Sequence, residues 1–180
     1  MTPTIRDAVP DDAAAVARIY APYVAETAIS FETEPPGVEA MGERIARCLA
    51  GHGWLVAERE GRVVGYAYAA PFAPRVAYRL SAEVSVYVDR AAGRRGAGTA
   101  LYGALLARLR ARGTHTAMAG IALPNAASVA FHERHGFHHA GTFREVGVKF
   151  GRWHDVGWWE RDLSVPGSPS SPRDGPPGTG

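Results

Sequence analysis

Cysteine is almost missing from this chain, since Cys48 is the only one among its 180 residues. A single cysteine excludes an intrachain disulfide and a zinc site built from several cysteines. Cys48 stands among Ile45, Leu49 and Ala50, so we interpret it as a packing residue of a helix rather than as a nucleophile. The histidines include no i, i+4 pair with a third ligand at a known spacing. The sequence therefore predicts no metal site.

Long apolar runs and a strong excess of charge are also missing. No run is long enough to span a bilayer, and the first residues contain no apolar signal-peptide core. The formal net charge is only +2, and the arginines do not gather in one stretch as they do in nucleic-acid-binding domains. We therefore expect a cytoplasmic protein that binds neither a membrane nor nucleic acid.

Hydrophobic residues make up 46% of the chain, which is enough for one domain with a core. Residues 1–163 are predicted to form it, whereas the Pro-, Gly- and Ser-rich residues 164–180 are expected to be disordered. Pro22 is expected to kink or break its helix. Hydrophobic periodicity predicts helices at 13–26, 37–50, 99–112 and 125–135, and strands at 4–9, 54–60, 62–70, 78–89, 116–123, 137–150 and 153–163. This order predicts a three-layer α/β sandwich around a mixed, mostly antiparallel sheet.

The stretch from Glu83 to Ala100 is the most informative part of the sequence. It reads as a strand, then a turn rich in glycine and arginine, then the start of an amphipathic helix. Gly96 and Gly98 allow backbone N–H groups to approach an anion, and Arg94 and Arg95 can pair with phosphate oxygens. The turn is not a Walker A loop, because no Gly-Lys-Ser/Thr follows it.

The order Arg-x-x-Gly-x-Ala from Arg95 to Ala100 resembles the acetyl-CoA pyrophosphate loop of the GNAT N-acetyltransferase superfamily. A second stretch, from Asn125 to Phe137, resembles the GNAT segment Asn-x-x-Ala/Ser-x-x-x-Tyr-x-x-x-Gly-Phe, with His132 in place of the family's tyrosine. The resemblance implies a GNAT-like α/β/α fold and acetyl-CoA as cosubstrate without a metal. The cofactor-binding residues it implies are Val86, Tyr87, Val88, Arg94, Arg95, Gly96, Ala97, Gly98, Thr99 and Asn125.

The run Lys149-Phe-Gly-Arg-Trp-His-Asp155 is similar to that of the phosphinothricin and methionine sulfoximine N-acetyltransferase subgroup. This resemblance covers residues 5–163 and implies acetylation of the α-amino group of a small amino acid: phosphinothricin, methionine sulfoximine or methionine sulfone. It also implies a homodimer, and a role in antibiotic resistance or in detoxification of oxidised methionine analogues.

Acetyl transfer requires a neutral amine, and Glu83 is the candidate general base. The alternative is a carboxylate that pairs with an arginine across the sheet. His132 is a second base or the proton source for the thiolate, or else a helix histidine without a catalytic role. An amino-acid substrate also needs a cation for its carboxylate, which Arg75 can supply. The candidate substrate-binding residues are Phe31, Arg75, Tyr78, Glu83 and Ser85, with core packing as the other interpretation of Phe31.

Two other functions fit the same motifs. One is a GNAT enzyme that acts on a different amine, such as a polyamine, an aminoglycoside or a protein N-terminus. A polycationic substrate would favour an acidic cleft, which a net charge of +2 does not suggest. The other is a non-catalytic acyl-CoA sensor, which would keep the loop but would not need Glu83.

Overall fold

The computed structural model describes residues 2–92 and 96–164. Arg94 and Arg95, and the expected tail from residue 165 onward, lie outside the described residues. The strands and helices follow one another in the order that the sequence predicts. They are β1 (Thr4–Asp7), α1 (Ala13–Glu26), α2 (Val38–Gly51), β2 (Trp54–Arg59), β3 (Arg62–Pro71), β4 (Ser81–Val88), α3 (Ala97–Ala111), β5 (Thr116–Leu123), α4 (Ala126–Arg134), β6 (His138–Lys149) and β7 (Arg152–Asp162).

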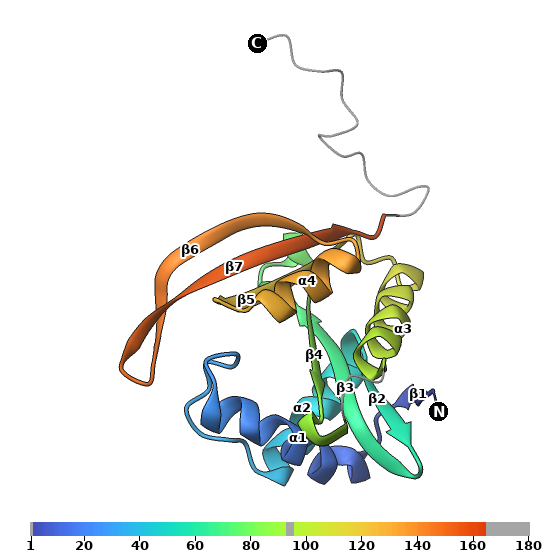
Figure 1. The fold of residues 1–180 in the computed structure, drawn as a ribbon. Coiled ribbons are helices and arrows are strands. Elements are labelled where there is room, and N and C mark those ends of the chain that lie inside the picture. Colours follow the sequence, from blue (N-terminus) through green and yellow to red (C-terminus); the bar gives the residue numbers. More distant parts are fainter. Residues whose placement is uncertain (1, 93–95, 165–180) are drawn as a thin grey trace, which may run out of the picture.

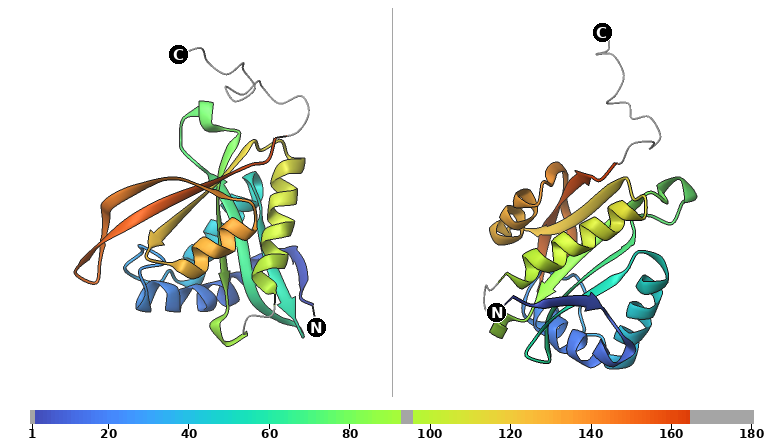
Figure 2. Two further views of the ribbon diagram at one scale, coloured as in Figure 1. Left: turned by 45° about the horizontal axis from the view of Figure 1, so that its top comes forward. Right: turned by 90° about the vertical axis from the view of Figure 1, so that its right-hand side faces the viewer.

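The seven strands form one sheet in the order β1-β2-β3-β4-β5-β7-β6. Every neighbouring pair is antiparallel except β4 and β5, which are parallel. Helices α1 and α2 cover one face of the sheet, and α3 and α4 cover the other (Figures 1 and 2). The prediction of a three-layer sandwich with a mixed, mostly antiparallel sheet is therefore confirmed.

Each face of the sheet has its own hydrophobic core. On one face, Leu101, Leu105 and Leu109 of α3 pack on the alternate residues Ala82 and Val84 of β4. On the other face, α1 and α2 enclose a cluster that includes Trp54 and Tyr66. The pleat of β4 therefore sends Ala82, Val84, Val86 and Val88 toward α3, and it sends Glu83, Ser85 and Tyr87 toward α1.

Strands β4 and β5 are paired only where they begin. Their register runs from Ser81 opposite Thr116 to Glu83 opposite Met118 and then ends. Beyond this point β4 stays paired with β3 as far as Val88, and β5 stays paired with β7 as far as Leu123. The two strands must therefore part after Glu83, and a gap opens in the middle of the sheet.

The last two strands form a long hairpin with an irregular middle. Phe143 pairs with Val156 and Gly147 pairs with His154, so three residues of β6 lie opposite Asp155 alone. The Asp155 carboxylate accepts a hydrogen bond from the N–H of Glu145 at 2.8 Å. A bulge of this kind bends its strand. The hairpin tip lies beside the segment between α1 and α2 (Figure 1).

Three local expectations can be compared with the structure. Pro22 does not break α1, which runs unbroken from Ala13 to Glu26, because buried Ile19 and Val24 hold the helix against the core on both sides of the proline. Strand β4 begins at Ser81 rather than at 78, since residues 76–78 form a 3₁₀ turn. Asn125 caps α4 as expected, with its side chain accepting a hydrogen bond from the N–H of Ser128 at 3.1 Å.

Candidate active site

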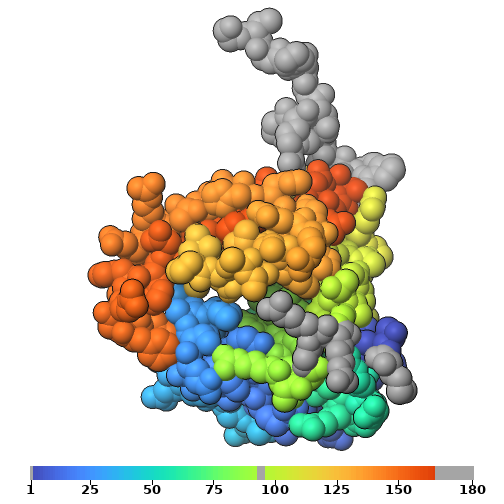
Figure 3. Space-filling view, viewed as in Figure 1, coloured from blue at the N-terminus to red at the C-terminus, as the bar shows by residue number. Residues whose placement is uncertain are grey.

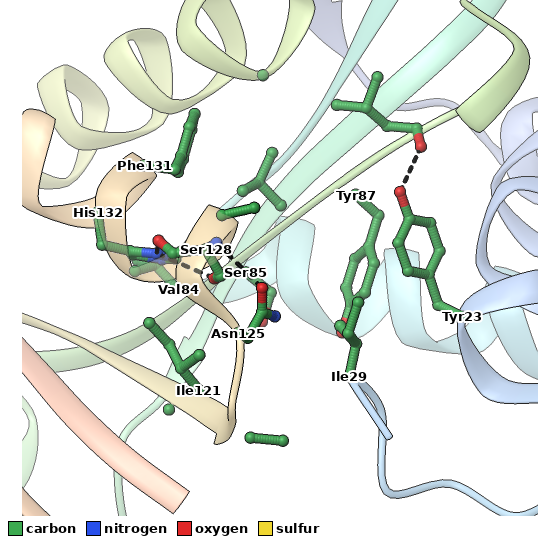
Figure 4. A pocket seen from close by; sticks show the side chains of 16 residues that line it. Tyr23, Ile29, Val84, Ser85, Tyr87, Ile121, Asn125, Ser128, Phe131 and His132 are labelled. Carbon is green, nitrogen blue, oxygen red and sulfur yellow. Dashed lines mark hydrogen bonds between the residues drawn. The ribbon is translucent and has the colours of Figure 1, made fainter. Parts of the chain in front are cut away.

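The gap between β4 and β5 is the floor of a cleft with a volume of about 340 Å³. Figure 3 shows a hollow on this side of the molecule, and Figure 4 shows the side chains around it. Both core faces contribute to its lining, because the sheet is open here. The lining residues are Tyr23, Ile29, Val84, Ser85, Val86, Tyr87, Val88, Gly98, Gly120, Ile121, Ala122, Asn125, Ala127, Ser128, Phe131 and His132.

The edge of β4 offers backbone hydrogen-bonding groups to this cleft. The N–H of Asp89 bonds to the carbonyl of Val64 in the β3 segment, and the carbonyl of Ser81 accepts a bond from Phe72. Because backbone groups alternate along a strand, the odd-numbered residues of β4 are bonded to β3 and the even-numbered ones face the gap. The N–H groups of Val86 and Val88 therefore point into the cleft, whereas that of Tyr87 points toward β3.

Tyr23, which the sequence analysis missed, completes this edge. Its hydroxyl donates a hydrogen bond of 2.6 Å to the carbonyl of Val88 (Figure 4). The guanidinium of Arg90 lies 5.1 Å from the centre of the Tyr23 ring. The sequence signal was only that Tyr23 lies close to Tyr20 on a helix face, which is also what simple packing would give.

The start of α3 borders the same cleft. Gly96 is the N-cap residue with φ +79°, a left-handed conformation that favours glycine. Ala97, Gly98 and Thr99 form the first turn, and N–H groups in a first turn have no partner within their helix. Gly98 lines the cleft. The structure thus brings this part of the predicted anion-binding loop to the mouth of the open sheet edge.

Glu83 occupies the last position at which β4 and β5 are still paired. Its side chain lies on the α1 face of the sheet, one residue before the lining of the cleft begins. Burial raises the pKa of the Glu83 carboxyl above its ordinary value. None of the ion pairs among the described residues involves Glu83. Within these residues, the structure therefore gives no support to the alternative that Glu83 pairs with an arginine across the sheet.

His132 lies on α4, and its imidazole is buried at the side of the cleft. Nδ1 lies 2.8 Å from the carbonyl oxygen of Ser128, which can only accept, so Nδ1 carries the proton and Nε2 keeps its lone pair. Burial lowers the pKa of His132 below its ordinary value, while the bond to the Ser128 carbonyl opposes part of that change. The ring is therefore neutral near pH 7 and is better suited to accept a proton than to donate one.

The remaining predicted residues lie at different places around the cleft. Ser85 lines it, and so does Asn125, whose side-chain oxygen is used by the α4 cap. Arg75 and Tyr78 are exposed in the segment 72–80, which leads into the end of β4 where Glu83 lies. Phe31 is not among the lining residues, but Ile29 of the same segment is. The sequence analysis also missed Phe131 and Ile121, because apolar residues of a helix and a strand look the same in a core and in a cleft.

A protein-family model described as "Acetyltransferase (GNAT) domain" matches residues 5–158 of the chain. The chain belongs to the GNAT acetyltransferase family. The phosphinothricin N-acetyltransferase of Streptomyces viridochromogenes is 41% identical over 169 residues, which cover 94% of this GNAT chain and 92% of that protein. The L-methionine sulfoximine/L-methionine sulfone acetyltransferase of Pseudomonas paraeruginosa is 38% identical over 165 residues, covering 91% and 96%.

Solved structures agree with this family assignment. A GNAT superfamily phosphinothricin acetyltransferase from Sinorhizobium meliloti, crystallised with acetyl-CoA, superposes on this GNAT fold with a TM-score of 0.87 at 36% identity. The match covers 91% of this chain and 90% of that chain. The protein is thus an acetyl-CoA-dependent N-acetyltransferase.

The described residues fit the acyl donor of this family. Acetyl-CoA carries its thioester on an amide-containing arm that ends in phosphates. The open β4 edge offers backbone partners to such amides, and the first turn of α3 offers N–H groups and a positive helix end to phosphates. No cluster of three or more His, Cys, Asp or Glu residues within 2–92 and 96–164 could hold a metal ion. No helix in these ranges is long and apolar enough to cross a membrane.

The buried position of His132 gives a prediction for its titration. Because burial disfavours the imidazolium, His132 should titrate below about 6.5, the ordinary histidine value, and should carry its neutral proton on Nδ1. Long-range ¹H–¹⁵N NMR spectra recorded between pH 5 and 8 would measure both, with His132→Asn identifying the signal. Titration above the ordinary value, or a proton on Nε2, would contradict this assignment.

Proposed function

We propose that the protein transfers the acetyl group of acetyl-CoA to the α-amino group of a small amino acid such as phosphinothricin, methionine sulfoximine or methionine sulfone. The observation that carries this choice of acceptor is the similarity to two named groups of amino-acid acetyltransferases over more than 90% of the chain. Cytoplasmic chemistry of this kind would remove toxic amino-acid analogues and so confer resistance to them.

Glu83 is the general base in this proposal. An α-amino group is mostly protonated at neutral pH and must lose a proton before it can attack a carbonyl. A carboxylate whose pKa is raised by burial is a better proton acceptor than one in water, and Glu83 has no ion-pair partner among the described residues to oppose this. Glu83 acts on the amine directly or through one water molecule.

The edge of β4 polarises the carbonyl that is attacked. Donors that point at the place where negative charge develops stabilise the transition state more than the ground state. The N–H groups of Val86 and Val88 are the donors proposed here, because they face the cleft from the strand that carries Glu83. His132, with Nε2 unprotonated, accepts a proton during turnover rather than supplying one.

The acceptor lies on the α1 side of the sheet, where the side chains of Glu83 and Ser85 are found. Arg75 is proposed to bind its carboxylate, since an exposed guanidinium in the segment 72–80 can form a bidentate pair. Tyr78 lies in the same segment, and Phe31 lies in the segment 27–37 that contributes Ile29 to the cleft. These three residues form the walls around the amino acid in this proposal.

The alternative functions are less favoured by the site. A sensor that only binds acyl-CoA would have no use for Glu83, and a half-buried carboxylate without an ion-pair partner costs folding free energy. A polyamine or aminoglycoside would need several carboxylates near the cleft. None of the described residues that line the cleft is an aspartate or a glutamate, and Glu83 lies just before that lining begins.

The exposed side of the β6–β7 hairpin supports a homodimer. Trp153 is 63% exposed and Phe143 is 61% exposed, and Val146, Val148 and Phe150 are exposed on the same hairpin. A second, mostly apolar hollow lies at its base and is lined by Phe72, Met118, Trp158 and residues 140–143. Large apolar residues gathered in this way usually mark an interface. We propose that a second copy of the chain covers this surface.

Thiol release from acetyl-CoA tests the proposed acceptor. Phosphinothricin, methionine sulfoximine, methionine sulfone, spermidine and a short peptide with a free N-terminus should be offered in parallel to the purified protein. Turnover is expected with one or more of the three amino acids and not with spermidine or the peptide. Turnover with spermidine or the peptide alone would replace this proposal by the different-amine alternative.

Replacing Glu83 by Gln tests the base. The variant should lose about 100-fold or more of kcat/KM and still bind acetyl-CoA. In the parent enzyme, kcat/KM should fall as pH falls through the raised pKa of Glu83, since only the carboxylate is a base. The variant should lack this acidic limb.

Stability gives a control for the same variant. The folded-state pKa of Glu83 is raised, so its charge disfavours the folded state above that pKa and has no effect well below both pKa values. Glu83→Gln should therefore raise Tm at pH 7, while Glu43→Gln, at an exposed position in the middle of α2, should alter neither activity nor Tm. A Glu83→Gln enzyme that retains full activity would show that Glu83 is not the base.

The hairpin surface gives a prediction for assembly. A double change of Phe143 and Trp153 to Ser should convert a dimer into a monomer, because a stable interface needs about 800 Å² of complementary surface on each partner. Sedimentation equilibrium at several concentrations measures this. A parent protein that is monomeric at 100 µM would contradict the dimer, as would a variant that stays dimeric.

A further inference from the structure

Lys149 is the only lysine of the chain, and the other 19 of its 20 cationic residues are arginine. It is also one of the most buried charged residues, with 4% of its surface exposed. An ammonium is a compact charge on a flexible stem, whereas a guanidinium is a broad planar fork. The single lysine of an otherwise arginine-based set of cations thus stands at position 149, where the side chain is enclosed.

The surroundings of the Lys149 ammonium explain why it must be compact. Nζ donates hydrogen bonds of 2.6 Å to the carbonyl oxygens of both Val24 and Ser30. Val24 lies in the last turn of α1, whose carbonyls carry partial negative charge. The Phe150 ring lies 5.1 Å from Nζ. Lys149 therefore joins the tip of the β6–β7 hairpin to the end of α1 and to the segment that follows it.

Ser30 extends this connection into the molecule. Its hydroxyl lies 2.6 Å from the hydroxyl of Tyr20, which in turn donates a 2.8 Å bond to the Glu32 carboxylate. Arg44 of α2 holds Glu32 with two bonds of 2.6 and 2.9 Å. The hairpin tip, α1, the segment 27–37 and α2 thus share one polar network, which is buried at Lys149, Ser30 and Tyr20 and partly exposed at Glu32 and Arg44.

The same network fixes two residues beside the cleft. The Phe31 ring packs so closely on Gly147 of β6 that a Cβ at this position would overlap it, and it also lies 6.0 Å from the His154 ring. Ile29 lines the cleft itself. Tyr20 contacts the ring of Tyr87, another lining residue, at 4.9 Å. Phe31 and Ile29 stand on either side of Ser30, the residue that Lys149 binds.

We propose that Lys149 is a positioning residue of the acceptor site. It latches the hairpin to the segment 27–37 and so holds Ile29 and Phe31 where they form one wall for the amino acid. This inference rests on the proposed function, because it assigns that wall to the acceptor rather than to acetyl-CoA. It predicts that removing the hydrogen bonds of Lys149 raises the KM for the amino acid and leaves the KM for acetyl-CoA unchanged.

Kinetics of Lys149→Met test this selectivity, since methionine fills similar space without the charge. The acceptor KM should rise about tenfold or more, while the KM for acetyl-CoA should stay within about twofold. Lys149→Arg should not restore the acceptor KM, because the fork does not fit two converging carbonyls. Arg152→Met, which removes an exposed cation three residues further along the hairpin, is the matched control and should change neither constant.

Gly147→Ala is a second route to the same effect, should Lys149→Met fold poorly. The added methyl group must displace the Phe31 ring and leaves the contacts of Lys149 in place. The same selective rise in acceptor KM is expected. A general loss of stability with both KM values unchanged in the two variants would show that the latch has only a structural role, and would overturn the proposal.

Hydrogen exchange gives a measurement that does not depend on activity. The N–H groups of Ile29 and Glu32 bond to the hydroxyls of Thr27 and Ser30, and both should exchange faster in Lys149→Met than in the parent or in Arg152→Met. Unchanged exchange would overturn the latch. If the parent enzyme acetylates no amino acid, the proposed function fails and the acceptor role of Lys149 fails with it. If it does and the acceptor KM of Lys149→Met is unchanged, only the role of Lys149 is refuted.

Discussion

The site depends on a hydrogen-bonded ladder that stops after three pairs. Strands β4 and β5 are paired from Ser81 to Glu83 and then diverge, because β4 remains paired with β3 and β5 remains paired with β7. The unpaired edge supplies the N–H groups of Val86 and Val88, and the last paired position carries Glu83. Backbone donors and a carboxylate are thus held in fixed relation by one strand.

Lys149 is buried and Glu83 is half-buried, and the two charges are accommodated in opposite ways. Lys149 donates hydrogen bonds to two carbonyl groups from α1 and from the segment after it, so its burial connects these elements to the hairpin. Glu83 has no ion-pair partner among the described residues, and burial shifts its pKa instead. Hydrogen bonds from a buried charge connect parts of the structure, whereas partial burial without an ion-pair partner shifts a pKa, and the two residues show these two outcomes within one sheet.

The sequence was informative wherever the deciding interactions are local. The bounds of α1 and β5 and the Asn125 cap follow from periodicity and from hydrogen bonds between near neighbours. The break that was expected at Pro22 as one of two outcomes does not occur, because tertiary packing holds α1 together across the proline. The bonds of Tyr23 to Val88 and of Lys149 to Ser30 could not be found in this way, since the partners lie 65 and 119 residues apart. Only the folded register brings them together.

The bond between Tyr23 and Val88 gives the cleft a direction. At the level of Val88 the carbonyl is already occupied, while the N–H of the same residue still faces the opening. The edge of β4 is therefore rich in donors at its far end and poor in acceptors. A ligand arm that presents a carbonyl there meets a free donor, whereas one that presents an N–H must share the Val88 carbonyl with the Tyr23 hydroxyl. The tyrosine thus weakens the far end of this strand edge as an acceptor and leaves it intact as a donor.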